Sequence, residues 1–347
     1  MNKNVELLKN INLPFSEFSK LSQERESHVL GAICYLAEPL TRPAEWLIDA
    51  PLMRVSMPPL GETSAGPVCD VWFSASALAT GQRGDIRYRH DGRTLFGVIE
   101  LDENEPEANS ASTPLQHTTE RAYRQIFELL EALGYPFIGQ LWNYMADING
   151  HSHGLERYRQ FNLGRQDAFI ACQRDVVGNV PAACALGAVG GPLTIAFLAG
   201  KKSPLVIENP RQISAYDYPQ NYGSRSPTFS RASLVQLGSD EVLLISGTAS
   251  IVGHSTMHVG DVKAQTHETL TNIEAVIQAA NLQASRPLFL FNKLLYSVYV
   301  RHSADFAAVR EVMVTRIGTS FDAVFLQADI CRQDLLMEIE ASATLAA

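Results

Sequence analysis

The residues with the clearest chemical potential lie near the end of the chain, in residues 321–340, FDAVFLQADICRQDLLMEIE. Glu338 stands there between Met337 and Ile339 in an apolar run. Apolar surroundings raise the pKa of a carboxyl, and a carboxyl that keeps its proton near neutral pH can act as a general acid. The same pattern allows Glu338 to point to solvent from an edge strand. The sequence therefore makes Glu338 a candidate acid and leaves that alternative open.

The alternation of side chains in this stretch predicts a hairpin of residues 322–331 and 334–340, with its bend at Arg332-Gln333. Facing residues of a hairpin share one side of the sheet. We expect one side to pack on helices through Leu326, Ala328, Ile330, Leu335, Met337 and Ile339. The other side would carry Gln327, Asp329, Cys331, Asp334, Leu336, Glu338 and Glu340. Cys331 would then lie beside Glu338, although a small free thiol more often only packs.

Several side chains upstream could bind a carboxylated ring. The irregular segment 209–232 is rich in Arg and Tyr: Arg211, Tyr216, Tyr218, Tyr222, Arg225 and Arg231. Arginine gives two parallel donors to a carboxylate and tyrosine gives a ring face and a hydroxyl, but a solvated loop is the alternative. Arg301, which ends the strand-like YSVYVRH, has the same two interpretations. The small residues Gly247 and Ala249 indicate close strand packing or a wall near a ligand.

Other kinds of site and partner are disfavoured. His254 and His258 are four residues apart, but in a glycine-flanked loop and not on a helix, so we expect no metal. GAVGGP (187–192) lacks the Lys-Ser/Thr of a phosphate loop, and no cofactor is expected. The net charge of −9 without a Lys/Arg block argues against nucleic acid and membrane partners. The polar start and five scattered cysteines favour a cytoplasmic protein with reduced thiols.

The elements that must position these residues follow a repeated order. Strands are expected at 85–89, 93–101, 137–148, 193–199 and 205–208, with helices at 118–133 and 155–176. The second series has strands at 233–237, 242–251 and 288–300, helices at 262–280 and 304–316, and the final hairpin. Both series read β-β-α-β-α-β-β. This predicts an α+β fold of two similar halves, each with helices on one sheet face and the other faces packed together.

The expected domains follow from this order. They are an N-terminal extension (1–64), a first half (65–212), an Arg/Tyr-rich connecting segment (213–232) and a second half that carries the active site (233–347). Within the first 113 residues we expect a short helix at 5–10, irregular chain or short edge strands at 29–67, a strand at 68–76 and an exposed loop at 102–113.

Long motifs in one order resemble the chorismatase family. They are NPRQISAYDYP with YGSRSP, then ISGTASIVGHSTMHVGD, QTHETLTNIEAVIQAA, the strand ending YVR, and ADICRQDLLMEIEA. The resemblance spans roughly 65–345 and is densest in 205–340. It implies cleavage of chorismate to pyruvate and a ring product without metal or cofactor. It also implies a YjgF/RidA-like (chorismate mutase-like) second half, which matches the repeated layout.

The resemblance gives roles to the candidate residues. Glu338 would protonate the enolpyruvyl methylene, Arg225, Arg231 and Arg301 would bind the carboxylates, and Tyr216 and Tyr222 would hold the ring or a carboxylate. Cys331 and the Gly247/Ala249 region would select the product. We expect 3-hydroxybenzoate, alone or with 4-hydroxybenzoate. The alternatives are hydrolysis to a trans-dihydroxycyclohexadiene carboxylate and a non-catalytic or imine-processing RidA-like metabolite-binding protein. A monomer or a small homo-oligomer is expected.

Overall fold

The N-terminal strands form a sheet of their own in the computed structural model, which describes residues 8–21, 23–37, 49–61, 66–103, 112–237, 240–285 and 289–345. The sheet has the order β1-β4-β2-β3. Its strands, with two short helices between the first two, are β1 (Leu8–Pro14), α1 (Phe15–Phe18), α2 (Gln23–Glu26), β2 (Val29–Leu36), β3 (Leu52–Ser56) and β4 (Val68–Ser74). The predicted boundary at 64/65 therefore falls inside this sheet.

Two predictions for this region need correction. Residues 8–10 of the predicted helix 5–10 are strand, and residues 5–7 lie outside the described residues. Residues 29–36 are not irregular, because they form strand β2, which is buried along its whole length. A continuous apolar run fits a strand covered on both faces, and β2 contributes side chains to a core on each side. The predicted loop at 102–113 lies mostly outside the described residues.

The expectation that all five cysteines are reduced thiols is wrong for the two cysteines of this sheet. Cys34 on β2 and Cys69 on β4 are directly opposite each other in the antiparallel ladder and form a disulfide. Residues opposed in this way bring their Cβ atoms close together. Cys172, Cys184 and Cys331 are free thiols, as predicted.

The first half is a sheet with the order β20-β11-β8-β12-β7-β6-β5, and α3 and α4 cover one face. Thr113 caps α3 by accepting a hydrogen bond from the Gln116 amide, and Gly134 ends it in a left-handed conformation (φ 72°). The elements are β5 (Ala79–Arg83), β6 (Ile86–His90), β7 (Thr94–Leu101), α3 (Pro114–Leu133), β8 (Phe137–Ala146), α4 (Arg157–Ala171), β11 (Ala182–Ala188) and β12 (Leu193–Gly200). A small hairpin, β9 (His151–Ser152) and β10 (Leu155–Glu156), precedes α4.

The second half repeats the first strand by strand. Its sheet has the order β13-β14-β15-β21-β18-β19. The elements are β13 (Leu205–Ile207), β14 (Ala232–Leu237), β15 (Asp240–Thr248), α5 (Val262–Asn281), β18 (Leu295–Val300), α6 (Phe306–Ile317), β19 (Asp322–Gln327) and β21 (Met337–Leu345). β8 is parallel to β11 as β18 is to β19, and β12 and β21 are the antiparallel returns. The predicted α+β duplication is confirmed, with one correction to the first half. Its sheet contains β11, where no strand was predicted, whereas β13, predicted as its last strand, pairs with β14 of the second half.

The predicted terminal hairpin is wrong. β19 and β21 do not pair, because β18 lies between them and pairs with both. The β18–α6–β19 unit is a parallel crossover, after which β20 (Asp329–Ile330) leaves the sheet and pairs with β11 of the first half. Met337 and Ile339 pack toward the helices as expected, but Leu326, Ala328, Ile330 and Leu335 belong to the core between the sheets. Glu338 therefore faces Tyr299 across the ladder and not Gln327.

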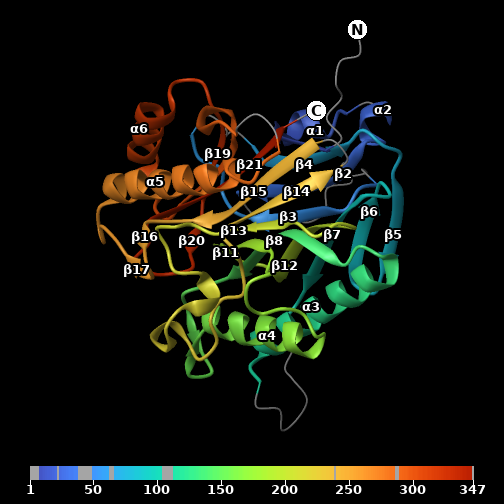
Figure 1. Ribbon diagram of the computed structural model, residues 1–347, viewed down its shortest axis with the longest axis horizontal. Coiled ribbons are helices and arrows are strands. Elements are labelled where there is room, and N and C mark those ends of the chain that lie inside the picture. The colour runs from blue at the N-terminus through green and yellow to red at the C-terminus, as the bar shows by residue number, and fades with distance from the viewer. Residues whose placement is uncertain are drawn as a thin grey trace.

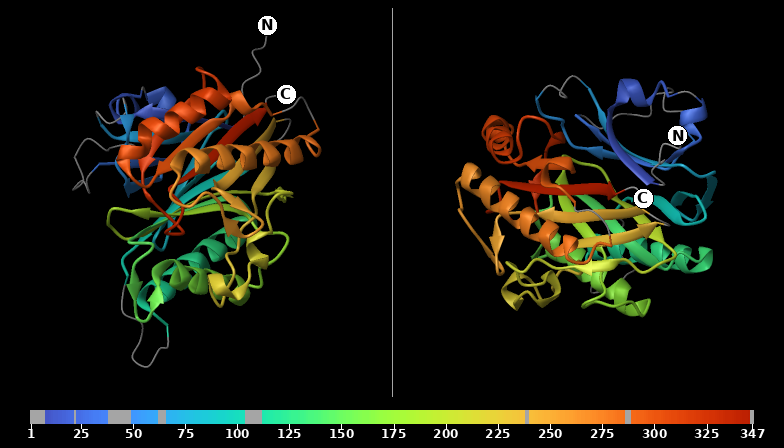
Figure 2. Two further views of the ribbon diagram at one scale, coloured as in Figure 1. Left: turned by 90° about the vertical axis from the view of Figure 1, so that its left-hand side faces the viewer. Right: turned by 45° about the horizontal axis from the view of Figure 1, so that its top comes forward.

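The halves stack with their helices outward (Figure 1). Helices α3 and α4 cover one outer face and α5 and α6 the opposite one, while a third core fills the space between the sheets. The N-terminal sheet (blue) and the connecting segment (yellow) lie at opposite sides of the molecule (Figure 2). No helix among the described residues is long and apolar enough to cross a membrane.

Candidate active site

A cavity of about 470 Å³ lies where the connecting segment meets the start of α4, the end of β15 and the start of β21. Both halves contribute to its wall. The lining residues are His151, Glu156, Tyr158, Arg159, Tyr218, Asn221, Tyr222, Pro227, Phe229, Arg231, Gly247, Ala249, Ile251, Cys331, Arg332, Gln333, Asp334, Leu335 and Glu338. Cavities of this size hold small metabolites.

Glu338 lies in this wall and is buried, with 4% of its surface exposed. A register shift in the β15–β21 ladder between Ile245 and Thr248 places Gly247 against its carboxyl. A Cβ at Gly247 would overlap Glu338 Oε1, so the glycine makes room for the acid. Burial, and next the Glu340 carboxyl, raise the pKa of Glu338 to about 8, against the lowering effect of Arg231. Glu338 therefore keeps its proton at neutral pH, as a general acid must.

Arginines and tyrosines of the wall hold each other in place. Arg231 donates to the Ile213 carbonyl (2.7 Å) and the Tyr218 hydroxyl (2.8 Å). The Arg332 guanidinium lies 4.1 Å from the Tyr222 ring centroid and 5.1 Å from that of Tyr218. Such contacts fix the planar guanidinium groups, which suits them to bind carboxylates.

His254 belongs to this support. Tyr222 donates its hydroxyl proton to the His254 carbonyl (2.7 Å), and Arg332 Nη1 donates to the same oxygen (2.9 Å). In the second histidine of the pair, His258, Nε2 lies 3.5 Å from Glu268 Oε2. Among the described residues, no three His, Cys, Asp or Glu side chains gather as metal ligands do.

The cavity brings together five of the predicted site residues, namely Glu338, Tyr222, Arg231, Cys331 and Ala249. Their contacts with a substrate stay predictions. Burial, and next Glu338, raise the pKa of the Cys331 thiol to about 12. Cys331 is therefore a neutral thiol near the acid and is unsuited to be a nucleophile.

The other three predicted residues lie outside the wall. Tyr216 does not line the cavity, and Arg225 is exposed and pairs with Asp167 at 3.8 Å. Arg301 binds the chain around the cavity, because it donates to the carbonyls of Leu335 (2.9 Å), Ile330 (3.1 Å) and Arg332 (2.9 Å). Its Nη1 donates to the Asp329 carboxylate (2.5 Å) and to Asn149 Oδ1 (3.1 Å), so every nitrogen of the guanidinium has a partner in the protein and its placement favours a role in shaping the loop between β20 and β21.

Sequence reasoning did not select several residues of the wall. Arg332 was placed at a hairpin bend, and the start of α4 was treated as an ordinary helix. Tyr218 was within the Arg/Tyr-rich segment but was not chosen, although its aromatic type was the same signal that selected Tyr222. The missed residues with side chains suited to a ring or a carboxylate are Tyr158, Arg159, Tyr218, Phe229 and Arg332.

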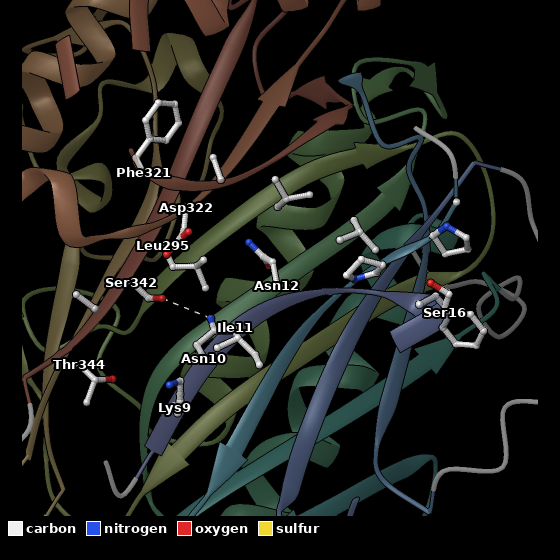
Figure 3. A pocket seen from close by; sticks show the side chains of 18 of the residues that line it. Lys9, Asn10, Ile11, Asn12, Ser16, Leu295, Phe321, Asp322, Ser342 and Thr344 are labelled. Carbon is white, nitrogen blue, oxygen red and sulfur yellow. Dashed lines mark hydrogen bonds between the residues drawn. The ribbon is translucent and has the colours of Figure 1, made fainter. Parts of the chain in front are cut away.

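A larger groove of about 1170 Å³ lies elsewhere, between β1 and the β19–β21 side of the second sheet (Figure 3). Asn10 Nδ2 reaches Ser342 Oγ across it at 3.4 Å. Its described lining contains lysines but no arginine, and Asp322 is its acidic residue. The groove therefore lacks the buried acid and the planar cations, and the smaller cavity is the better candidate despite its size.

The comparisons with known proteins agree with this architecture. The family model described as "Chorismatase FkbO/Hyg5-like, N-terminal" matches residues 70–199, and "Endoribonuclease L-PSP" matches residues 227–345. A 3-hydroxybenzoate synthase of Streptomyces hygroscopicus is 39% identical over 288 residues, 80% of this chain and 82% of that protein. A chorismatase of Streptomyces rapamycinicus is 38% identical over 278 residues, 78% and 80% of the two chains.

A solved structure matches the whole architecture. A chorismatase crystal structure superposes with a TM-score of 0.84 at 30% identity, and the match covers 99% of this chain and 100% of that one. Fold and site together define two RidA-like halves that enclose a buried carboxylic acid. The chain belongs to the chorismatase family.

Proposed function

We propose that this protein cleaves chorismate to pyruvate and 3-hydroxybenzoate, with Glu338 as the acid. The observation that carries the proposal is a buried carboxyl in the wall of a cavity that also presents arginines and aromatic rings, and burial raises the pKa of that carboxyl to about 8. Chorismate offers the matching groups: two carboxylates, a ring and an enolpyruvyl ether. Relatives named 3-hydroxybenzoate synthase and chorismatase support the same assignment.

The reaction begins with transfer of the Glu338 proton to the terminal methylene carbon of the enolpyruvyl group. The ether carbon then becomes an oxocarbenium-like centre, and the Glu338 carboxylate left behind stabilises that positive charge. Burial makes this stabilisation stronger than it would be in water. Two neighbours of Glu338 are poor acids for this step, because burial raises the pKa of the Cys331 thiol to about 12 and the Arg231 guanidinium does not release a proton at neutral pH.

The arginines orient the substrate. Arg231 and Arg332 are held by neighbouring tyrosines, and Arg159, at the start of α4, forms an ion pair with Glu156 (3.1 Å). We assign the two substrate carboxylates to this group, and the rings of Tyr218, Tyr222 and Phe229 to contact with the cyclohexadiene. Fixed cations on one side and the acid on the other hold the methylene carbon near the Glu338 carboxyl.

The fate of the ring decides the product. In the first route the neighbouring ring hydroxyl attacks the ring carbon that bears the ether oxygen, the bond between that carbon and oxygen breaks, and pyruvate leaves. The hydroxyl proton replaces the one that Glu338 gave, and a proton shift from ring carbon to oxygen gives hydroxybenzoate with no other reactant. In the second route one water adds to the oxocarbenium-like carbon, and the ether then breaks to give pyruvate and a dihydroxycyclohexadiene carboxylate. The Cys331 side chain lies beside the acid and occupies space that a water molecule would need. This favours the route in which no water is added. The expected product is 3-hydroxybenzoate, alone or with 4-hydroxybenzoate. A cytoplasmic location stays a prediction.

One assay tests the proposal. The purified protein is incubated with chorismate, pyruvate is measured by reduction with lactate dehydrogenase, and the ring product is identified by chromatography and mass spectrometry. Pyruvate with 3-hydroxybenzoate is expected. A protein that releases no pyruvate would be a metabolite-binding relative, and pyruvate with a non-aromatic diol would show the hydrolytic reaction.

A further inference from the structure

Two buried carboxyls behind Glu338 have no place in the reaction described above. Glu340 lies two residues after Glu338 on the same inner face of β21, and Asp70 lies on β4 of the N-terminal sheet. They are 5% and 4% exposed. Within the described part of the chain, neither forms an ion pair with Lys, Arg or His. Buried carboxyls without a cation are costly unless they share protons or hydrogen bonds.

Both carboxyls line one small cavity of about 20 Å³, and all three large sheets contribute residues to its wall. Five side-chain atoms of its wall are buried and have no hydrogen-bond partner among the described residues: Asn10 Oδ1, which belongs to a half-buried residue, and the four atoms Asp70 Oδ1, Trp72 Nε1, Gln140 Oε1 and Glu340 Oε1 of deeply buried residues. The residues of these four atoms are at least nine-tenths buried. Buried polar atoms almost always have partners, so this cluster marks a ligand site.

The chemistry of the wall identifies the ligand as a water molecule. The volume suits one water, which needs about 10–15 Å³ of such space. Trp72 Nε1 can only donate, whereas Gln140 Oε1 can only accept. A cation would be repelled by the tryptophan N–H. A water accepts from that N–H and donates to the carboxyl oxygens, so it can join Asp70 to Glu340.

The pair is connected to the catalytic acid. Cys184 on β11 forms a hydrogen bond with Glu340 and lines a second small cavity together with Glu338 and Gly247. Tyr299, which is opposite Glu338 in the ladder, has its hydroxyl 3.5 Å from Glu340 Oε2. The chain of hydroxyls continues to Tyr144 (3.2 Å) and Tyr35 (3.1 Å), which lies on β2 beside β4. The N-terminal sheet is thereby coupled to the site on the other side of the molecule.

We propose that Asp70 and Glu340 are positioning residues that share one proton through an internal water and so set the pH up to which Glu338 keeps its proton. The inference rests on the proposed function of Glu338 as the acid. Two buried carboxyls that face one small cavity do not readily ionise together, so the pair carries a single negative charge. Only the share of that charge that lies on Glu340 acts on Glu338 from its own strand. Other ionisable groups that surround Glu338 are Tyr158, Arg165, Cys184, Arg231 and Cys331.

The directions of the pKa shifts agree with this arrangement. Burial raises the pKa of Asp70 to about 7. Burial, and further the charge of Asp70, raise that of Glu340 to about 8, while hydrogen bonds from Cys184, Trp142 and Tyr299 lower it. Ionised Asp70 thus keeps the proton on Glu340, and ionised Glu340 would keep the proton on Glu338. Charge on Glu340 therefore raises the pKa of Glu338, whereas charge on Asp70 lowers it by keeping Glu340 neutral.

The test is the alkaline limb of kcat/KM for pyruvate release, measured from pH 6 to 10 in the full chain. Glu340→Gln removes the nearer charge, so the limb should move down by about one pH unit, with KM little changed. Asp70→Asn lets Glu340 ionise earlier, so the limb should move up by a smaller amount. The matched control is Glu241→Gln, an equally buried glutamate at the far end of β15, which should leave the limb in place.

The outcomes are separable. If both variants move the limb in one direction, or either leaves it unmoved, the shared-proton pair is wrong and the residues are structural. If Glu340→Gln does not fold, Tyr299→Phe replaces it, because loss of that hydroxyl favours neutral Glu340 and should also move the limb down. Should the wild-type protein release no pyruvate, the proposed function fails. The pair is then tested by infrared titration of the carboxylic acid band that Glu338→Gln removes, with the same shifts expected.

Discussion

Strands β12 and β21 hold the same place in the two halves but carry opposite chemistry. β12 lies between β7 and β8, and β21 between β15 and β18. Thr194 faces Tyr144 across one ladder as Glu338 faces Tyr299 across the other. The next inward residue is Ala196 on β12 and Glu340 on β21. The apolar strand completes a core, whereas the acidic strand completes a site.

The difference shows what a buried acid requires from its surroundings. Glu338 has a glycine beside it and a cavity in front of it, and Glu340 has Cys184, Trp142 and Tyr299 as hydrogen-bond partners. Ala196 has none of this, because it is fully buried in the apolar core between the sheets. The first half thus acts as a rigid wall that buries the second half's acids and so raises their pKa values.

The largest expected effect is on stability. Ala196→Glu places a carboxyl at the β12 position that corresponds to Glu340, where it has neither cavity nor partners. We expect a loss of about 3–5 kcal/mol in the free energy of unfolding, measured by urea denaturation at pH 7. The reverse exchange, Glu340→Ala, should cost only about 1–3 kcal/mol, for the hydrogen-bond partners left unsatisfied. Equal losses would contradict the view that β21 has a prepared environment.

Glu338→Gln tests the acid itself. Glutamine keeps the shape of the side chain but cannot donate a carboxylic proton, so kcat should fall roughly 100-fold or more. Thermal unfolding should be close to that of the wild-type protein, since the group is neutral in both. Pyruvate release at a near-normal rate would remove Glu338 from the role of acid.

Gly247→Ala tests the space that the second half reserves for the acid. The new Cβ would overlap the end of the Glu338 side chain, which can rotate away at little cost in stability. The displaced carboxyl no longer reaches the methylene carbon, and kcat/KM should fall roughly 10- to 100-fold. Gly190→Ala is the control, because its Cβ would meet open space. Similar activity in both variants would show that the close approach at Gly247 has no catalytic purpose.

The same comparison explains how far the sequence could predict this molecule. Elements set by local pattern were predicted, such as the strands at 85–89 and 93–101 and the helix that ends at residue 133. The repeat of β-β-α-β-α-β-β was also foreseen, because both halves keep its order. Strand neighbours were not, because alternation in 322–340 cannot show that β18 inserts between β19 and β21. Pairing between distant segments is a property of the whole fold.

The site shows the same limit. A lone acid in an apolar strand is a local signal that made Glu338 a candidate, and the family resemblance gave it the role of acid, which stays a prediction; the structure places it, buried, in the cavity wall. Arg301 was given a substrate carboxylate, yet its donors bind backbone carbonyls of a loop that the sequence cannot fold by itself. Arg332 was not predicted as a site residue, because only the folded loop brings it to the tyrosines. Residue type was informative in each case, but side-chain direction required the tertiary structure.

A smaller effect concerns the pH dependence of stability. Glu338 and Glu340 have folded-state pKa values of about 8 and Asp70 of about 7, all above their usual values. The folded state therefore binds more protons than the unfolded state between about pH 4.5 and 8. The contribution of these groups to the free energy of unfolding is fully present below that pH window and is lost as the pH rises through it. Urea unfolding at pH 5, 6.5 and 8 should show declining stability, with a flatter decline in Glu340→Gln; an unchanged slope would mean that Glu340 is ionised in the folded protein.

The smallest change in rate is expected for Cys331→Ala, which alters the wall beside the acid without touching its proton. The thiol is neutral, so its loss should change kcat by less than about threefold. The space it leaves admits a water near the oxocarbenium-like centre, and the share of non-aromatic diol should rise relative to 3-hydroxybenzoate. Chromatography of the products measures that ratio. Cys172→Ala is the matched control, because Cys172 caps the far end of α4 in the first half. If both variants give the wild-type ratio, Cys331 only packs, and product choice must lie with other residues near Gly247 and Ala249.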